Sequence, residues 1–208
     1  MRNVEHWGVV VDAQDYRVRF QDVERFLPEC KQCRYYGKLW SCPPFAHDVQ
    51  AELDRFKSVF LLATRICYDE VDRKVWDSSE RAMEDVMRPI FDSSWALLTR
   101  FYRNLEEQHP GSRAFTLRCR YCEHCSRPDG MPCRHPRLMR CSLESWGFDL
   151  GRTTSELLGI DLEWSSKGKL PDSLTLVTAL FSPSELPQAD ELIAPLRQGN
   201  GQAQKRNE

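Results

Sequence analysis

The chain has 208 residues, with 29 lysines and arginines against 31 aspartates and glutamates, for a formal net charge of -2. This length suits one domain with a hydrophobic core, and the near-neutral charge offers no electrostatic footprint for a nucleic acid, so we expect no such partner. No apolar run approaches the roughly 18 residues of a membrane-spanning helix, and the N-terminus shows no export signal. We therefore expect a cytoplasmic protein without a membrane partner.

The N-terminal part of the chain predicts short strands followed by a helix and a longer strand. Residues 5–13 and 16–20 are rich in valine and aromatic residues, so we expect two strands or one hairpin there. A loop over residues 29–45 follows. Helical spacing covers residues 47–57, and the apolar residues 58–69 predict a buried strand.

The longest periodic segment, residues 77–109, predicts one kinked helix or two consecutive helices. Asp77 followed by Glu80 resembles a capping box, which marks a helix start. Pro89 interrupts the pattern, because proline removes a backbone donor and clashes with the preceding turn. The sequence His-Pro-Gly at residues 109–111 predicts the end of the helical region.

Short elements follow towards the C-terminus. Two helical turns, each followed by a glycine that can end it, are expected at residues 142–146 and 153–158. Two strands joined by a turn are expected at residues 160–164 and 174–181. The polar residues 195–208 predict a disordered tail.

These elements predict an α+β fold, with a central and mostly antiparallel sheet packed by helices, because strand-rich ends surround a helical middle. We expect a single domain over residues 1–194, with two cysteine-rich loops at about 29–45 and 118–141.

Nine cysteines are the strongest signal in the composition. Three lie in the first loop and five in the second, while Cys67 stands alone. The cytoplasm keeps thiols reduced, so clustered cysteines there indicate metal or redox chemistry rather than disulfides. We therefore interpret both loops as metal-binding.

The second loop holds three cysteines at successive three-residue spacings, Cys119, Cys122 and Cys125, and Cys133 follows. Such a run can wrap around a cubane cluster and ligate three irons, and a more distant cysteine completes the coordination, as in bacterial ferredoxin loops. Structural zinc sites more often use separated cysteine pairs. The pattern therefore favours an iron-sulfur cluster of the 4Fe-4S type, with zinc as the alternative.

The first loop offers three cysteines, Cys30, Cys33 and Cys42, without a local fourth ligand. Three interpretations stay open. The site can leave one metal position free for a substrate, as catalytic metal sites do. The two loops can exchange ligands, as in two-cluster ferredoxins. A fourth ligand can also come from elsewhere in the chain, with four candidates: Cys67, Cys141, His47 and Cys133.

Several neighbouring residues have a structural interpretation beside a functional one. Core packing is the favoured role of Cys67, because free cysteines are often buried, whereas Cys141 is an equally good candidate for ligation. His124 and His135 flank cysteines and are expected to be neighbours rather than ligands. Both Cys67 and Cys141 stay additional ligand candidates.

Arginines surround the second group of cysteines. They would stabilise the reduced form of a negatively charged cluster, form a docking patch for an acidic redox partner protein, or simply be a solvated basic face. These arginines are Arg118, Arg120, Arg127, Arg134, Arg137 and Arg140.

In combination, these motifs resemble a family of predicted metal-binding proteins, domain of unknown function 2284, over about residues 30–150. The resemblance implies metal binding, with an iron-sulfur cluster favoured, and an association with oxygen-sensitive metabolism, but no substrate. The chain differs from the expected pattern at Cys141, where we expect proline, and at Trp146, where we expect a smaller residue. The matching residues are Cys30, Cys33, Trp40, Ser41, Cys42, Pro43, Pro44, Cys119, Cys122, Cys125, Cys133, Pro136, Ser142, Glu144, Gly147 and Asp149.

The leading hypothesis is an iron-sulfur protein with one or two clusters, serving electron transfer or redox support of a partner enzyme. Two alternatives belong to other classes. One is an enzyme that uses a three-cysteine cluster with an open iron site, and the other is a structural zinc-binding interaction module. No catalytic residue is identified from the sequence.

Overall fold

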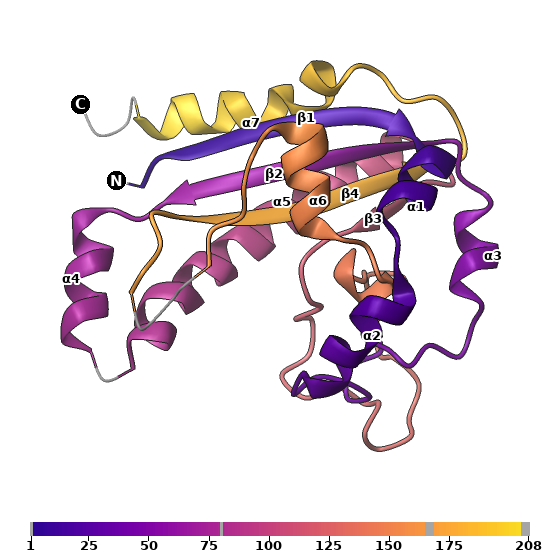
Figure 1. The fold of residues 1–208 in the computed structure, drawn as a ribbon, viewed down its shortest axis with the longest axis horizontal. Helices are drawn as coiled ribbons and strands as arrows, with labels where there is room; N and C mark the ends of the chain where they lie inside the picture. The colour runs from indigo at the N-terminus through magenta and orange to yellow at the C-terminus, as the bar shows by residue number, and fades with distance from the viewer. Residues whose placement is uncertain (1, 80, 165–168, 205–208) are drawn as a thin grey trace.

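A computed structural model describes residues 2–79, 81–164 and 169–204 (Figure 1). These residues form a four-stranded antiparallel sheet in the order β1-β2-β4-β3, with helices on its faces. The α+β fold predicted from the sequence is thereby confirmed. The strands are β1 (Val4–Asp12), β2 (Ser58–Cys67), β3 (Arg113–Phe115) and β4 (Ser173–Ser182).

The central strand of the sheet is β2, which pairs with β1 on one side and with β4 on the other. Trp7 lies opposite Ala63 in the first pairing, and Ala63 lies opposite Val177 in the second. Because both neighbours and both faces are covered, β2 is apolar along almost its whole length. This confirms the buried strand predicted there.

One face of the sheet packs against α5 (Arg88–Gln108) and α7 (Ala189–Gln204). Phe60 and Leu62 of β2 belong to this core, together with side chains from both helices. The hydroxyl of Tyr102 on α5 donates a hydrogen bond to Thr178 Oγ1 of β4 at 2.9 Å. That hydrogen bond gives both buried hydroxyl groups a partner within the apolar core between α5 and the sheet.

The opposite face packs against α1 (Ala13–Phe20), so the strand expected at residues 16–20 is wrong. Asp12 ends β1 and caps the helix, because its side chain accepts a hydrogen bond from the Asp15 backbone N–H at 2.8 Å. Tyr16 and Phe20 lie about one helical turn apart, so both point from the same face of α1 and are fully buried against the sheet. Tertiary burial therefore overrides the strand propensity of this segment.

A helix that the sequence analysis missed, α4 (Glu70–Ser78), follows β2. Its capping box is formed by Asp69 and Asp72, whose side chains accept hydrogen bonds from each other's backbone N–H. The start expected at Asp77 is therefore wrong, because Asp77 lies inside α4, and its expected partner Glu80 lies outside the described residues.

Pro89 marks the start of α5 instead of a kink within one helix. A π-helical turn over Met83–Met87 runs directly into α5, and proline is tolerated in the first turn, where its missing N–H would have no partner. The alternative of two consecutive helical segments is thus confirmed. The predicted end of the helical region is also confirmed, because α5 ends at Gln108 and His109 is its C-cap residue.

The C-terminal elements agree only partly with expectation. The strand at residues 174–181 is confirmed as part of β4, whereas residues 160–164 form no strand. Strand β2 pairs along the whole of β4, whereas β3 pairs only with residues 179–181 on the other edge. Helix α7 continues beyond Pro195, where the tail was expected to begin, and Leu196 packs in the core; residues 205–208 lie outside the described ranges.

The remaining helices are short and lie around the cysteine-bearing parts of the chain. The two expected turns are present as a 3-10 turn over Glu144–Trp146 and as α6 followed by a π-helical turn, each ended by a glycine with positive φ. Within the described ranges, no helix has the length and apolar content needed to cross a lipid bilayer. The short helices around the cysteine-bearing parts of the chain are α2 (Val23–Gln32), α3 (Val49–Leu53) and α6 (Leu150–Thr153).

Asp72→Asn is expected to lower the free energy of unfolding by about 1 kcal/mol at pH 7. The Asp72 side chain is 4% exposed and accepts a hydrogen bond from Arg2 Nε at 2.8 Å, which holds the pKa of the carboxyl below its usual value. A lowered folded-state pKa stabilises the protein above the unfolded-state pKa, and this stabilisation is lost as pH falls through the folded-state value. The deficit of the variant should therefore shrink below about pH 4, as measured by urea unfolding.

The matched control is Asp172→Asn, which removes the carboxylate from the pair between Asp172 and Arg73. The Asp172 side chain is 88% exposed, so its loss should leave stability almost unchanged. An Asp72→Asn deficit of the same size at pH 7 and at pH 2 would contradict the role given to the carboxylate charge.

Candidate metal centre

Both groups of cysteines lie in a lobe below one end of the sheet, beside α2 (Figure 1). Two stretches without helix or strand build this lobe, residues 33–48 and residues 116–143, here called the first and second cysteine segments. Cys30 lies in the last turn of α2, so the first segment begins later than the loop expected at residue 29.

Four cysteines of the second segment line one small cavity of about 20 Å³, here called the cysteine cavity. Burial raises the pKa of the Cys119 thiol, and the charges of the other three cysteines raise it further. The charges of the four thiols therefore act on one another across the cavity that they share. They are Cys119, Cys122, Cys125 and Cys133.

Two hydroxyl groups in the lining of the same cavity make no hydrogen bond of normal geometry with the described residues, although the Ser41 hydroxyl acts on the adjacent Cys42 thiol. They are Ser41 Oγ of the first segment and the Tyr121 hydroxyl of the second, both buried. A buried hydroxyl without a partner is costly, and sulfur atoms of a bound metal centre are acceptors that such donors can reach. The donor set thus fits a metal–thiolate centre. Sequence reasoning did not select these hydroxyls, although Ser41 belongs to the motif shared with the resembling family.

Within the first group of cysteines, Cys42 is the one on which the charge of Cys141 acts, while the pKa of Cys141 itself depends on its burial and then chiefly on Arg113 and Trp146. Burial raises the pKa of the Cys42 thiol to about 11, and the charges of Cys141, Cys33 and Cys30 contribute to the shift in that order. Burial also raises the pKa of Cys30, with Glu144 and Cys33 as further causes. Cys141 itself is 1% exposed and lies in the core beneath the lobe.

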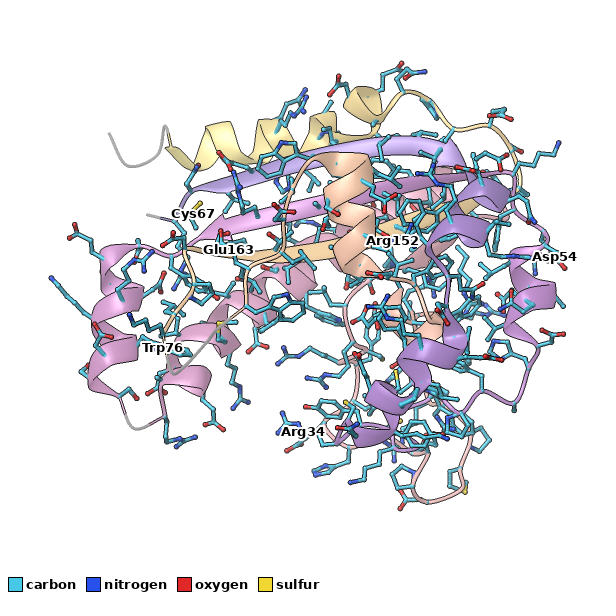
Figure 2. All side chains as sticks on the ribbon, viewed as in Figure 1. Arg34, Asp54, Cys67, Trp76, Arg152 and Glu163 are labelled. Carbon is cyan, nitrogen blue, oxygen red and sulfur yellow. The ribbon has the colours of Figure 1, made fainter. Side chains whose placement is uncertain are left out.

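Of the other candidates for a fourth ligand, Cys67 and Cys133 lie elsewhere, whereas His47 lines a cavity of about 340 Å³ together with Cys30. Cys67 ends β2 far from the lobe, and Figure 2 shows it at the left end of the sheet, well away from Arg34, which directly follows Cys33. Cys133 lines the cysteine cavity, and the His47 ring packs near Trp146 with ring centroids 5.8 Å apart. In the described part of the chain, no three His, Cys, Asp or Glu side chains are spaced to hold a single metal ion.

Arg127 of the second segment holds the first segment in place. Its Nη1 donates hydrogen bonds to the carbonyl oxygens of Leu39 at 2.7 Å and Cys42 at 2.6 Å, and its Nη2 donates to that of Pro44. In the reverse direction, Trp40 Nε1 donates to the carbonyl of the second segment's Met131 at 3.1 Å. The two cysteine segments therefore form one packed unit.

Most of the arginines around the second group of cysteines have a local structural partner. Arg140 pairs with Glu106, Arg120 pairs with Asp92, and Arg134 donates to a backbone carbonyl of its own segment. Arg118 differs, because its guanidinium lies 4.1 Å from the centre of the Tyr35 ring. A simple solvated basic face therefore does not describe this group of arginines.

Gly147→Ala is expected to destabilise the protein by about 3 kcal/mol and to loosen α2. Gly147 has φ +82°, and a Cβ at this position would meet the backbone Cα of Val23, the first residue of α2, at 2.8 Å. The Asp22 backbone N–H also donates to the Gly147 carbonyl at 2.8 Å. Thermal unfolding and metal content measure the two effects.

Gly159→Ala provides the matched control, because Gly159 also has positive φ but its Cβ would meet nothing within 4 Å. Only the backbone strain of about 1 kcal/mol is expected there, with metal content unchanged. Equal destabilisation by both alanines would show that the contact with α2 contributes nothing.

Comparison with known proteins gives one family match. No curated protein and no solved structure matches the chain. A family model described as a predicted metal-binding protein matches residues 10–181, a range that contains both groups of cysteines and the central strand β2. The chain therefore belongs to the family of predicted metal-binding proteins defined by the domain of unknown function 2284.

Proposed function

We propose that this metal-binding protein holds an iron-sulfur cluster, of the 4Fe-4S type, on Cys119, Cys122, Cys125 and Cys133. The observation that carries the proposal is that these four cysteines line one cavity. Their three-residue spacing is typical of cluster-binding loops. The unpartnered hydroxyls of Ser41 and Tyr121 add donors of the kind that surround cluster sulfurs.

A second centre would use Cys30, Cys33 and Cys42, with Cys141 as its fourth ligand. Cys141 supports this assignment because its charge acts on the Cys42 thiol more strongly than those of Cys33 and Cys30. The competing interpretation, an open iron position for a substrate, requires that Cys141 is not a ligand.

A bound iron-sulfur cluster would supply a one-electron redox couple, which suits electron transfer or redox support of a partner enzyme. The chain's own residues would position the thiolates and set their surroundings. Arg127 keeps the first segment against the second, and the hydroxyls of Ser41 and Tyr121 would donate to the sulfur of a bound cluster, which would stabilise its reduced form. All nine cysteines are free thiols, which accords with a reducing compartment such as the cytoplasm.

Metal analysis of the anaerobically purified full chain tests this function. We expect about four iron and four sulfide per chain if one centre is filled and about eight of each if both are, with a brown colour that bleaches on reduction. Stoichiometric zinc without sulfide would overturn the cluster assignment. That result would favour the structural zinc-binding interaction module, whose loops would unfold when a chelator removes the metal.

A further inference from the structure

A larger cavity of about 540 Å³ lies where both cysteine segments meet α5, and we call it the arginine cavity. Small-molecule sites typically enclose about 300–1,000 Å³, so its size suits a ligand of several ring or chain atoms. The cavity is separate from the cysteine cavity, and nothing in the proposed cluster chemistry uses its residues.

Positive charge gathers around this cavity although the chain as a whole is acidic, with a net charge of -2. Four arginines line it against two glutamates, of which Glu84 pairs with Arg81 on the surface. The first segment, the second segment and α5 each contribute arginines. They are Arg34, Arg118, Arg120 and Arg88.

Two of these arginines carry charge that no carboxylate neutralises. Arg120 pairs with Asp92, which also lies 3.9 Å from Arg88. Arg34 and Arg118, by contrast, form no ion pair with any residue that the structure describes. Their guanidinium carbons lie 4.8 Å and 4.1 Å from the centre of the same Tyr35 ring.

Holding two unpaired guanidiniums against one ring costs free energy, because their like charges repel each other. An anion bound between them would remove this cost and accept charge-assisted hydrogen bonds from both. Planar guanidinium groups match the oxygens of phosphate and carboxylate in particular.

The α5 side of the arginine cavity is aromatic. Phe91 and Trp95 lie one helical turn apart on α5, and both are half-buried in the lining. Half-buried aromatic faces beside positive charge suit a ligand that has a flat ring attached to its anionic group.

We propose that the arginine cavity binds a small organic anion in which a phosphate or carboxylate is attached to an aromatic ring. Arg34 and Arg118 bind the anionic group, and Phe91 and Trp95 contact the ring. This site goes beyond the proposed metal centre and does not depend on which metal that centre holds.

The arginine cavity and the cysteine cavity share an aromatic wall. Trp95 lines the first and Tyr121 lines the second, and their rings meet edge to face with centroids 5.0 Å apart. A ligand against Trp95 would therefore lie one aromatic pair away from the cysteines. Its binding is expected to change the visible spectrum of the bound metal.

Isothermal titration calorimetry on the metal-loaded full chain at low salt tests the proposal. The probes are phenyl phosphate, benzoate and adenosine monophosphate, with phenol, adenosine and inorganic phosphate as their partial counterparts. At least one aromatic anion should bind with a Kd of about 1 mM or tighter and about tenfold better than its uncharged counterpart. The ranking of phenyl phosphate against benzoate tells phosphate from carboxylate.

Variants locate the binding site. Arg34→Ala and Arg118→Ala are each expected to weaken binding about tenfold, and Arg118→Lys, which keeps the charge, less. Arg55→Ala is the matched control, because Arg55 also lies over an aromatic ring but outside the cavity, and it should leave the Kd unchanged. Circular dichroism and metal content confirm that each variant is folded and loaded.

The proposal is overturned if no probe binds more tightly than about 10 mM, if phenol or adenosine binds as well as its anion, or if Arg55→Ala weakens binding as much as Arg118→Ala. A missing metal centre would instead appear as low metal content, with the binding of the anions still measurable by calorimetry. Failure of this site and failure of the proposed function are therefore distinguishable.

Discussion

Cys122→Ser protein, purified anaerobically, is expected to contain about four iron and four sulfide fewer per chain than the unaltered protein. Cys122 lines the cysteine cavity together with the three other proposed ligands. A serine hydroxyl stays protonated near pH 7 and is a poor ligand for iron, so a cluster held by three thiolates should be lost during purification. Iron and sulfide analysis with the visible spectrum measures this loss.

Cys67→Ser is the matched control, because it makes the same chemical change at the end of β2, far from the lobe (Figure 2). Full metal content is expected. Cys141→Ser separates the two interpretations of the first group of cysteines. Loss of the second centre would support Cys141 as its fourth ligand, whereas unchanged iron and sulfide would favour an open iron position. Equal loss from Cys67→Ser and Cys122→Ser would count against the cysteine cavity as the metal centre.

Arg127→Ala is expected to lower the free energy of unfolding by about 3 kcal/mol and to reduce metal retention at both centres. The guanidinium donates to carbonyl oxygens at Leu39, Cys42 and Pro44, of which the Leu39 carbonyl also accepts from the Cys42 backbone N–H at 3.1 Å. The first segment would then separate from the second. Urea unfolding measures stability, and the rate of metal loss to a chelator measures the coupling between the segments.

Two variants control for charge and for position. Arg127→Lys keeps the positive charge but cannot reach three carbonyls with one ammonium group, so we expect it to behave more like alanine than like arginine. Arg134→Ala removes an arginine of the same segment that donates only to the His124 carbonyl, at 2.7 Å, and a smaller effect is expected. If Arg127→Ala and Arg134→Ala release metal at the same rate, Arg127 does not couple the segments.

Local sequence patterns predicted the fold best where burial follows a simple period. The run Val59–Ala63 is buried without interruption, so it reads as a central strand from its composition alone. Residues 16–20 were predicted wrongly, because valine and aromatic residues favour strands. In the structure they belong to α1, whose Tyr16 packs against Phe148 with ring centroids 4.9 Å apart, a contact between distant parts of the chain. The strand expected at residues 160–164 is absent for a similar reason, because whether a segment pairs with a neighbouring strand depends on the arrangement of the whole sheet.

Some features of the candidate site could likewise be predicted from local sequence, and others could not. The cysteine groups were visible in the sequence because ligand spacing within a loop is a local property, and the family match depends on it. The contribution of Ser41 and Tyr121 to the cysteine cavity was not visible, because a hydroxyl without a partner is recognised only when its surroundings are known.

The sequence by itself determined the family, the α+β class and the cysteine groups, since each of these depends on residue type and short-range spacing. Only the tertiary structure decided that Cys141 lies near Cys42 while Cys67 does not, and that Arg34 and Arg118 meet at one ring. These pairs are far apart in the chain. Their proximity arises from the burial of both faces of the sheet and from the docking of one cysteine segment on the other.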